Sequence, residues 1–143
     1  MKMGRINKWL INRPQHGRRA MKHAEKLLLS IDMQKKCNFL EIGCGNGAIS
    51  KHIAGKYPFE VTGIDVDPEM IQSAEKGILD MPDIRFVETD ATSLPFSDEN
   101  YHIVISFGMI HHILNWREVL LKIRRVLKQV DTSFTPILFT SGQ

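Results

Sequence analysis

The stretch "FLEIGCGNGAIS", residues 39–50, decides the fold because it joins an apolar run to a glycine-rich turn and then to a helical pattern. A strand that ends in such a turn and leads into a helix points backbone N–H groups and the positive end of the helix toward a ligand. Glycine suits the turn, since a Cβ would block close approach and since such turns often need a positive φ. The stretch therefore predicts a βα unit with a nucleotide-like ligand at its loop.

Two kinds of ligand fit the glycine spacing. Gly43, Gly45 and Ala48 match the dinucleotide fingerprint G-x-G-x-x-G/A. Gly43, Gly45 and Gly47 match G-x-G-x-G equally well, with Glu41 two residues earlier. Like charges repel at close range, so Glu41 argues against a pyrophosphate and suits the ammonium and sulfonium of S-adenosylmethionine. The alternative role for Glu41 is to cap or bond the loop backbone.

Two further acidic positions predict an adenosine-type ligand. Asp65 ends an apolar run 22 positions after Gly43, where a carboxylate can accept from both ribose hydroxyls. Asp90 follows the next apolar run, where it can accept from the adenine amino group while the N–H of Ala91 faces a ring nitrogen. Both ligand types contain a ribose, so Asp65 does not choose between them. A solvent-facing loop aspartate is the alternative for Asp90.

The length and composition predict one globular domain over residues 1–143. The chain is 43% hydrophobic and 24% charged, as soluble domains are. Its longest apolar stretch, "IVISFGMIHHIL", is shorter than the roughly 18–20 residues of a membrane helix and contains two histidines. The two cysteines form no CxxC pair, and the basic N-terminus has no signal core behind it. We therefore expect a cytoplasmic protein with no membrane span and no metal site.

The charge is uneven along the chain. Residues 1–26 hold eight Lys or Arg and one acid, so they carry +7, and the remainder carries −4 of the net +3. A basic N-terminal arm (1–14) could steer an anionic substrate, a nucleic acid or a lipid headgroup. We favour a solvated leading segment, because Trp9 is the one aromatic residue among these charges.

Short apolar runs alternate with helical patterns, which predicts stacked βαβ units and a parallel sheet. The expected strands cover residues 37–43, 59–65, 84–89, 101–107 and 134–141. Pro136 cannot donate to a strand ladder, so the last strand is expected at a sheet edge. Helices are expected to start near residues 15, 46, 67 and 115. Gly55 is expected to close the second helix, Asp67 to cap the third, and Asn115 to open the fourth with a capping box.

Five stretches together resemble the class I S-adenosylmethionine-dependent methyltransferases, in particular the small-molecule group that includes the ubiquinone and menaquinone biosynthesis methyltransferases. They are "LEIGCGNG", "VTGIDVDPEMIQSA", "VETDATSLPFSDENYHIVIS", "FGMIHHI" and "WREVLLKIRRVLK", in that order over about residues 38–128. The resemblance implies an α/β, Rossmann-like, doubly wound domain. Its mainly parallel sheet of about five strands would have the order 3-2-1-4-5, with helices on both faces.

The resemblance also implies a cofactor site for S-adenosylmethionine, which leaves as S-adenosylhomocysteine. The glycine loop would lie near the methionine part, Val66 and Met70 beside adenine, and Ser106 or Phe107 near the end of the fourth strand. The candidate cofactor-binding residues are Glu41, Gly43, Cys44, Gly45, Gly47, Asp65, Val66, Met70, Asp90, Ala91, Ser106 and Phe107.

Two departures from the family pattern stand out. His102 occupies a position before the fourth strand where the family usually has an acid. The family continues after "RRVLK" with a proline-glycine-glycine turn, a fifth strand, further helices and an antiparallel pair, whereas residues 129–143 here read "QVDTSFTPILFTSGQ". We expect a diverged or truncated end that lacks the usual final strands, with an exposed sheet edge that a homodimer partner could cover.

The reaction implied is transfer of a methyl group to a small-molecule acceptor. Such an in-line displacement needs the acceptor atom held about 3–3.5 Å from the methyl carbon, and a base only if the acceptor must lose a proton. His111 and His112 follow the fourth strand and are the candidates for acceptor contact or base, with packing or solvated histidines as the alternative. The other functional hypotheses are a non-catalytic methyltransferase-like binding module and an NAD(P)-dependent oxidoreductase.

Overall fold

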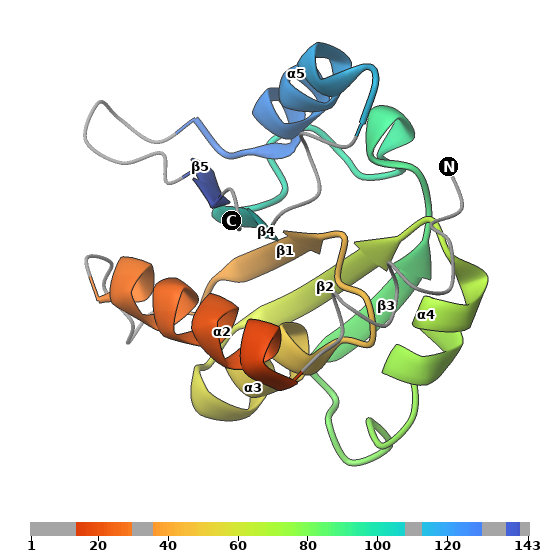
Figure 1. Cartoon of the computed structure of the whole chain (residues 1–143). Helices are drawn as coiled ribbons and strands as arrows, with labels where there is room; N and C mark the ends of the chain where they lie inside the picture. Colours follow the sequence, from red (N-terminus) through yellow and green to blue (C-terminus); the bar gives the residue numbers. More distant parts are fainter. Residues whose placement is uncertain (1–13, 30–35, 108–112, 130–136, 141–143) are drawn as a thin grey trace.

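The computed structural model describes residues 14–29, 36–107, 113–129 and 137–140. The predictions for the basic arm up to residue 13, for His111 and His112, and for residues 130–136 and 141–143 fall outside these ranges. The described elements (Figure 1) are α2 (Pro14–Leu28), β1 (Asn38–Ile42), α3 (Ala48–Lys56), β2 (Glu60–Asp65), α4 (Pro68–Ala74), β3 (Ile84–Glu88), the 3₁₀ turn η1 (Ala91–Ser93), β4 (Ile103–Phe107), α5 (Trp116–Val126) and β5 (Ile137–Thr140).

The described strands form one parallel sheet in the order β3-β2-β1-β4-β5. The predicted strand order is therefore confirmed, and β5 lies at an edge of the described sheet, as expected. β1 occupies the centre, where Glu41 pairs in register with Gly63 of β2 and with Ile105 of β4. Because every strand points the same way, the loops that follow β1, β2 and β3 gather at one edge of the sheet, and β4 ends at the same edge.

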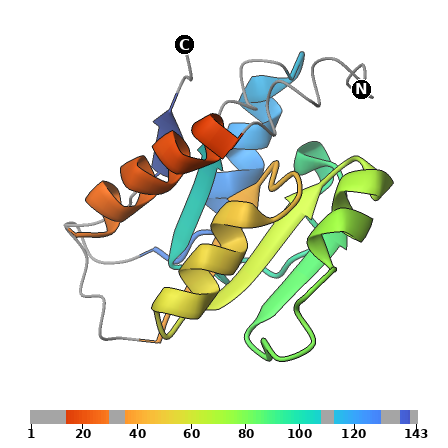
Figure 2. The ribbon, with the colours of Figure 1, turned by 60° about the horizontal axis from the view of Figure 1, so that its bottom comes forward.

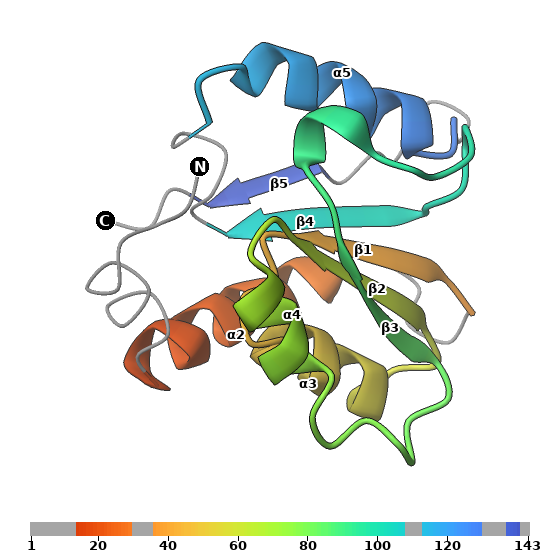
Figure 3. The ribbon, with the colours of Figure 1, turned by 90° about the vertical axis from the view of Figure 1, so that its right-hand side faces the viewer.

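Two apolar cores cover the two faces of the sheet. Helices α2, α3 and α4 lie on one face and α5 lies on the other, next to η1 (Figures 2 and 3). Three apolar residues on one side of α5, Val119, Ile123 and Val126, are fully buried. Burying a side chain of this size stabilises the fold by roughly 1.5–3 kcal/mol.

The helix ends follow local chemistry, which corrects two predictions. Asp67 caps α4 as expected, because its side chain accepts from the N–H of Glu69. Gly55 does not close α3, which continues to Lys56. The helix stops at Tyr57 because a residue that precedes proline is pushed into extended backbone, and Tyr57 has φ −121° and ψ 154°.

The capping box predicted for α5 was also wrong. Asn115 occupies the N-cap position, but its side chain makes no capping hydrogen bond. Its backbone, with φ −101° and ψ 44°, lies outside the extended region that a side-chain cap requires. The helix therefore starts on backbone bonds, such as the one from the N–H of Glu118 to the carbonyl of Asn115.

His102 takes a structural role at the start of β4. The imidazole Nδ1 of His102 accepts from the backbone N–H of Asn38 at 2.9 Å, and the backbone N–H of His102 donates to the carbonyl of Asn38. An accepting Nδ1 carries no proton, and burial lowers the pKa of His102, which favours this form. A neutral imidazole thus joins β4 to β1 where the family usually has an acid.

Candidate functional site

The candidate site lies at the carboxyl edge of the sheet, where β1, β2 and β3 end. Ligands of open α/β sheets bind at this edge. The glycine loop follows β1, Asp65 ends β2, and Asp90 lies two residues after β3. The topology therefore brings together three segments that are up to 47 positions apart in the sequence, from Gly43 to Asp90.

The loop after β1 depends on glycine at three alternate positions. Gly43, Gly45 and Gly47 have φ values of 73°, 54° and 78°, in the left-handed region that L-residues with a side chain rarely adopt. Gly47 is also closely packed, because a Cβ there would lie 2.5 Å from the ring of Phe86. Phe86 comes from β3 and was not singled out in the sequence.

The backbone amides of this loop are already bonded within the protein. The N–H groups of Gly43 and Cys44 both donate to the carbonyl of Ile64 at 2.9 Å. The N–H of Gly45 donates to Oδ2 of Asp65 at 3.0 Å. These bonds tie the loop to β2 and leave those three amides engaged.

The first turn of α3 is capped in the same way. The N–H of Ala48 donates to Oδ1 of Asn46 at 3.2 Å. Ser50 donates its hydroxyl and its backbone N–H to Glu41. A pyrophosphate binds where helix N-terminal amides point freely at it, and here the protein's own amide oxygen and carboxyl group take two of those positions.

Glu41 is a buried acid at the base of the loop. Its side chain is 2% exposed, and burial, as the largest cause, raises its pKa to about 8. The hydrogen bonds from Ser50 oppose this rise, while the charge of Asp65 adds to it. Glu41 therefore has the capping role that was the alternative from the sequence. Because its raised pKa leaves the carboxyl group partly neutral, Glu41 can still gain a negative charge when a cationic ligand group lies beside it.

Asp65 holds two backbone segments at once. Its Oδ2 accepts from Gly45, and its Oδ1 accepts from the N–H of Asp67 at 2.9 Å. Each carboxylate oxygen has a second lone pair, so these two bonds leave capacity for hydroxyl donors. The fixed orientation of the carboxylate suits the ribose role proposed from the sequence.

The residues expected beside adenine lie at the same edge. Val66 directly follows β2 and is 40% exposed, which is unusual for valine, and Met70 in the first turn of α4 is partly buried. Asp90 is exposed, and its Oδ1 accepts from the N–H and the hydroxyl of Thr92. These bonds cap η1 and lower the pKa of Asp90, so it is a charged acceptor whose Oδ2 is not used by Thr92.

The end of β4 carries a buried hydroxyl. Ser106 is 3% exposed, and its Oγ has no hydrogen-bond partner among the described residues. Ser106 lies on the α5 face, in register with Ile42, whereas Glu41 lies on the α3 face. Phe107 packs against the core of the α3 face. The two predicted β4 residues thus lie on opposite faces.

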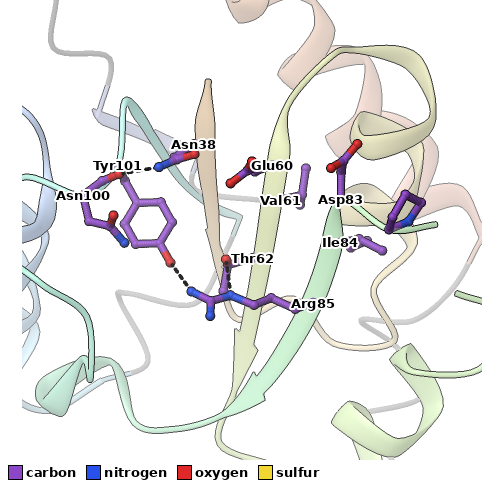
Figure 4. Close-up of a pocket in the computed structure, with 10 residues that line it drawn as sticks. Asn38, Glu60, Val61, Thr62, Asp83, Ile84, Arg85, Asn100 and Tyr101 are labelled. Atoms are coloured by element: carbon purple, nitrogen blue, oxygen red, sulfur yellow. Dashed lines mark hydrogen bonds between the residues drawn. The ribbon is translucent and has the colours of Figure 1, made fainter. Parts of the chain in front are cut away.

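A hollow of about 430 Å³ lies at the opposite edge of the sheet, where β1, β2 and β3 begin (Figure 4). Arg85 donates there from Nε to Thr62 at 3.1 Å and from Nη2 to the hydroxyl of Tyr101 at 3.4 Å. None of the predicted site residues lines this hollow. In the part of the chain that the structure describes, no three potential metal ligands gather, and no helix is long and apolar enough to cross a membrane.

With this geometry established, comparison with known proteins identifies the family. A model of the family described as "Methyltransferase domain" matches residues 39–130. This chain belongs to the class I S-adenosylmethionine-dependent methyltransferase family. It is 33% identical over 110 residues to a demethylmenaquinone methyltransferase of Thermotoga maritima, a match that covers 76% of this chain and 45% of the relative.

Two further comparisons add a curated relative and a solved structure of the same fold. An ajmaline N-methyltransferase of Rauvolfia serpentina is 29% identical over 98 residues, which cover 65% of this chain and 33% of the relative. The crystal structure of a SAM-dependent methyltransferase from Aquifex aeolicus has the same fold at 19% identity, with a TM-score of 0.72 over 89% of this chain and 69% of that one. The chain spans less than half the length of both curated relatives.

Proposed function

We propose that this domain binds S-adenosylmethionine and transfers its methyl group to a small-molecule acceptor. The observation that carries the proposal is the closed glycine loop, whose amides are bonded within the protein and whose base holds the buried acid Glu41. A cofactor with a pyrophosphate would face capped amides and the carboxylate of Asp65, whereas the ammonium and sulfonium of S-adenosylmethionine are attracted to Asp65 and favour ionisation of Glu41.

In this proposal, different described residues bind different parts of the cofactor. Glu41 and the loop receive the methionine part, Asp65 accepts from the ribose hydroxyls, and Val66 with Met70 covers adenine. Asp90 accepts from the adenine amino group through the oxygen that Thr92 does not use. The bound cofactor supplies a methyl group already activated by the sulfonium, so the protein's task is to orient the cofactor and exclude water.

The identity of the methyl acceptor does not follow from sequence similarity. Two relatives with about 30% identity are named for a quinone and for an alkaloid nitrogen, so sequence similarity at this level does not fix the acceptor or its atom. His111 and His112 stay candidates for contact with the acceptor. A panel of phenol, quinone and amine acceptors, assayed with radiolabelled S-adenosylmethionine, tests the activity. Cofactor binding without turnover on any acceptor would instead indicate a non-catalytic binding module.

Assembly is a second part of the proposal. β5 is an edge strand of the described sheet, and unpaired ladder groups on an edge favour pairing with another strand. A second copy of the chain is the partner we expect there. The molar mass measured by light scattering during gel filtration tests this, with the mass of a monomer at micromolar concentration as the contradicting result.

A further inference from the structure

The carboxyl group of Glu41 has an unusual environment for an acid. It is almost completely buried, and it accepts hydrogen bonds from the hydroxyl and the N–H of Ser50. Within the described residues no Lys, Arg or His nitrogen lies within 4.0 Å of it. A buried carboxylate without a cation is costly, and such a group keeps a proton instead.

Among the described residues, the elements next to Glu41 supply no compensating charge. The acid Asp65 approaches from β2, and its charge disfavours ionisation of Glu41. Ile105 of β4, its register partner, is apolar. Cys44 in the loop is buried, and burial raises the pKa of its thiol, so it is neutral as well.

The cations of α3 are engaged elsewhere. Nζ of Lys51 donates to the carbonyl of Lys76 at 2.9 Å. His52 and Lys56 both contact the carboxylate of Glu25 on α2, at 2.8 and 2.6 Å. Among the described residues no cation is left to stabilise an ionised Glu41, so a cationic ligand is the source of charge that we consider.

We infer that Glu41 holds a proton in the free protein and releases it to solvent when a cationic cofactor tail binds beside it, so that cofactor binding and proton release are one linked event. The inference rests on the proposed function, because the ligand cation is the ammonium or sulfonium of the cofactor. No covalent bond forms or breaks other than the O–H bond of Glu41. The site then favours ligands that keep their positive charge over neutral adenosine compounds.

The linkage has a definite sign. Below about pH 8 the free protein is protonated at Glu41, so binding must remove that proton. The apparent affinity for the cofactor then rises about tenfold for each unit of pH between about 6 and 7.5. The ammonium of the ligand stays charged over this range, so its own titration does not contribute.

The experiment is calorimetric titration of the full chain with S-adenosylhomocysteine at pH 6, 6.75 and 7.5, in phosphate and in imidazole buffer. The two buffers differ in ionisation enthalpy, so the difference in heat counts the protons released. We expect close to one proton per site and an affinity that rises about tenfold per unit of pH. The matched ligand is 5′-methylthioadenosine, which lacks the amino-acid end and should bind with no proton release and no dependence on pH.

Two variants assign the proton to Glu41. Glu41→Gln should bind S-adenosylhomocysteine more weakly, with no proton release and no slope. Ser50→Ala removes a hydrogen bond that favours the ionised form, so proton release should persist to higher pH. If Glu41→Gln does not fold, the shift in Ser50→Ala decides the assignment.

The outcomes separate the two proposals. Binding of S-adenosylhomocysteine with equal affinity at pH 6 and 7.5 and no proton release overturns the linkage and leaves the proposed function standing. Equal proton release by wild type and Glu41→Gln also overturns it, because another group would then be titrating. Absence of binding at every pH overturns the proposed function itself, and the linkage with it.

Discussion

The carboxylate of Asp65, at the end of β2, accepts a hydrogen bond of 3.0 Å from the N–H of Gly45, which lies 20 residues earlier in the glycine loop. One side chain thereby fixes the position of the loop and presents an acid at the carboxyl edge of the sheet. Because the two functions share a group, changes at Asp65 report on the candidate site directly.

Asp65→Ala should weaken the binding of S-adenosylhomocysteine at least about tenfold, since each charge-assisted hydrogen bond contributes roughly 1.5–3 kcal/mol and 1.4 kcal/mol is tenfold in affinity. Calorimetric titration measures the affinity. Glu88→Ala is the matched control, because Glu88 pairs with Asp65 in register on β3 but is exposed. Unchanged affinity in Asp65→Ala, or an equal loss in Glu88→Ala, would remove Asp65 from the site.

Gly47→Ala should lower the free energy of unfolding by about 1–3 kcal/mol, because a positive φ and a contact with Phe86 both oppose a side chain there. Gly55→Ala is the control. It lies inside α3 with open space around it, so the change should stabilise the protein by up to about 1 kcal/mol. Urea unfolding measures both, and equal effects of the two substitutions would contradict the assignment of strain to Gly47.

Arg125 of α5 fastens the loop between η1 and β4. Its guanidinium donates to the carbonyls of Leu94 and Phe96 at 2.8 and 2.7 Å and to the carboxylate of Asp98 at 2.8 Å. Arg125→Gln should cost about 2–4 kcal/mol in unfolding free energy, mainly through the two partly buried carbonyls. Arg124→Gln, at the exposed neighbouring position, should change it by less than about 0.5 kcal/mol. Similar losses in the two variants would show that the hydrogen bonds of Arg125 to this loop contribute little to stability.

His102 should make the fold less stable in mild acid. Burial lowers the pKa of His102 in the folded protein, so between that lowered pKa and the ordinary value the unfolded chain binds the extra proton. Its contribution to stability is present above the ordinary histidine pKa of about 6.5 and is lost as the pH falls through the folded pKa. His102→Asn keeps an acceptor for the N–H of Asn38 without a titrating group.

Urea unfolding at pH 7.5 and 5.5 tests this behaviour. Wild type should lose more unfolding free energy between the two pH values than His102→Asn does. The comparison cancels the contributions of the other histidines, which both proteins share. An equal loss in the two proteins would mean that the hydrogen bond from Asn38 to Nδ1 does not depend on the protonation of His102.

The fold was predictable because its signals are local and repeated. Apolar runs of strand length, separated by helical patterns, predicted the parallel sheet. The Asp67 cap was visible because the aspartate directly precedes a proline and a helical pattern. Gly55 misled because a glycine near a helix end is a weak stop, whereas Pro58 two residues after Lys56 was the stronger one.

The sequence singled out acids and glycines that the fold brings to one edge of the sheet, but it gave no sign of the contacts that support them. Ser50 bonds to Glu41 across nine positions, a spacing that no periodicity marks and that depends on how α3 crosses β1. The ring of Phe86 fills the space that a side chain at Gly47 or Gly63 would occupy, which only the pairing of β3 with β2 determines. Such contacts come from packing between elements, so a single sequence carries no direct signal for them.

The central claim is that the glycine loop receives the methionine end of S-adenosylmethionine and not a pyrophosphate. Competitive titration of the full chain with S-adenosylhomocysteine and NAD tests it most directly. The structure predicts one saturable site for S-adenosylhomocysteine, with affinity reduced in Asp65→Ala, and no displacement by NAD at millimolar concentration. Displacement of S-adenosylhomocysteine by NAD, or binding of NAD alone, would contradict the claim.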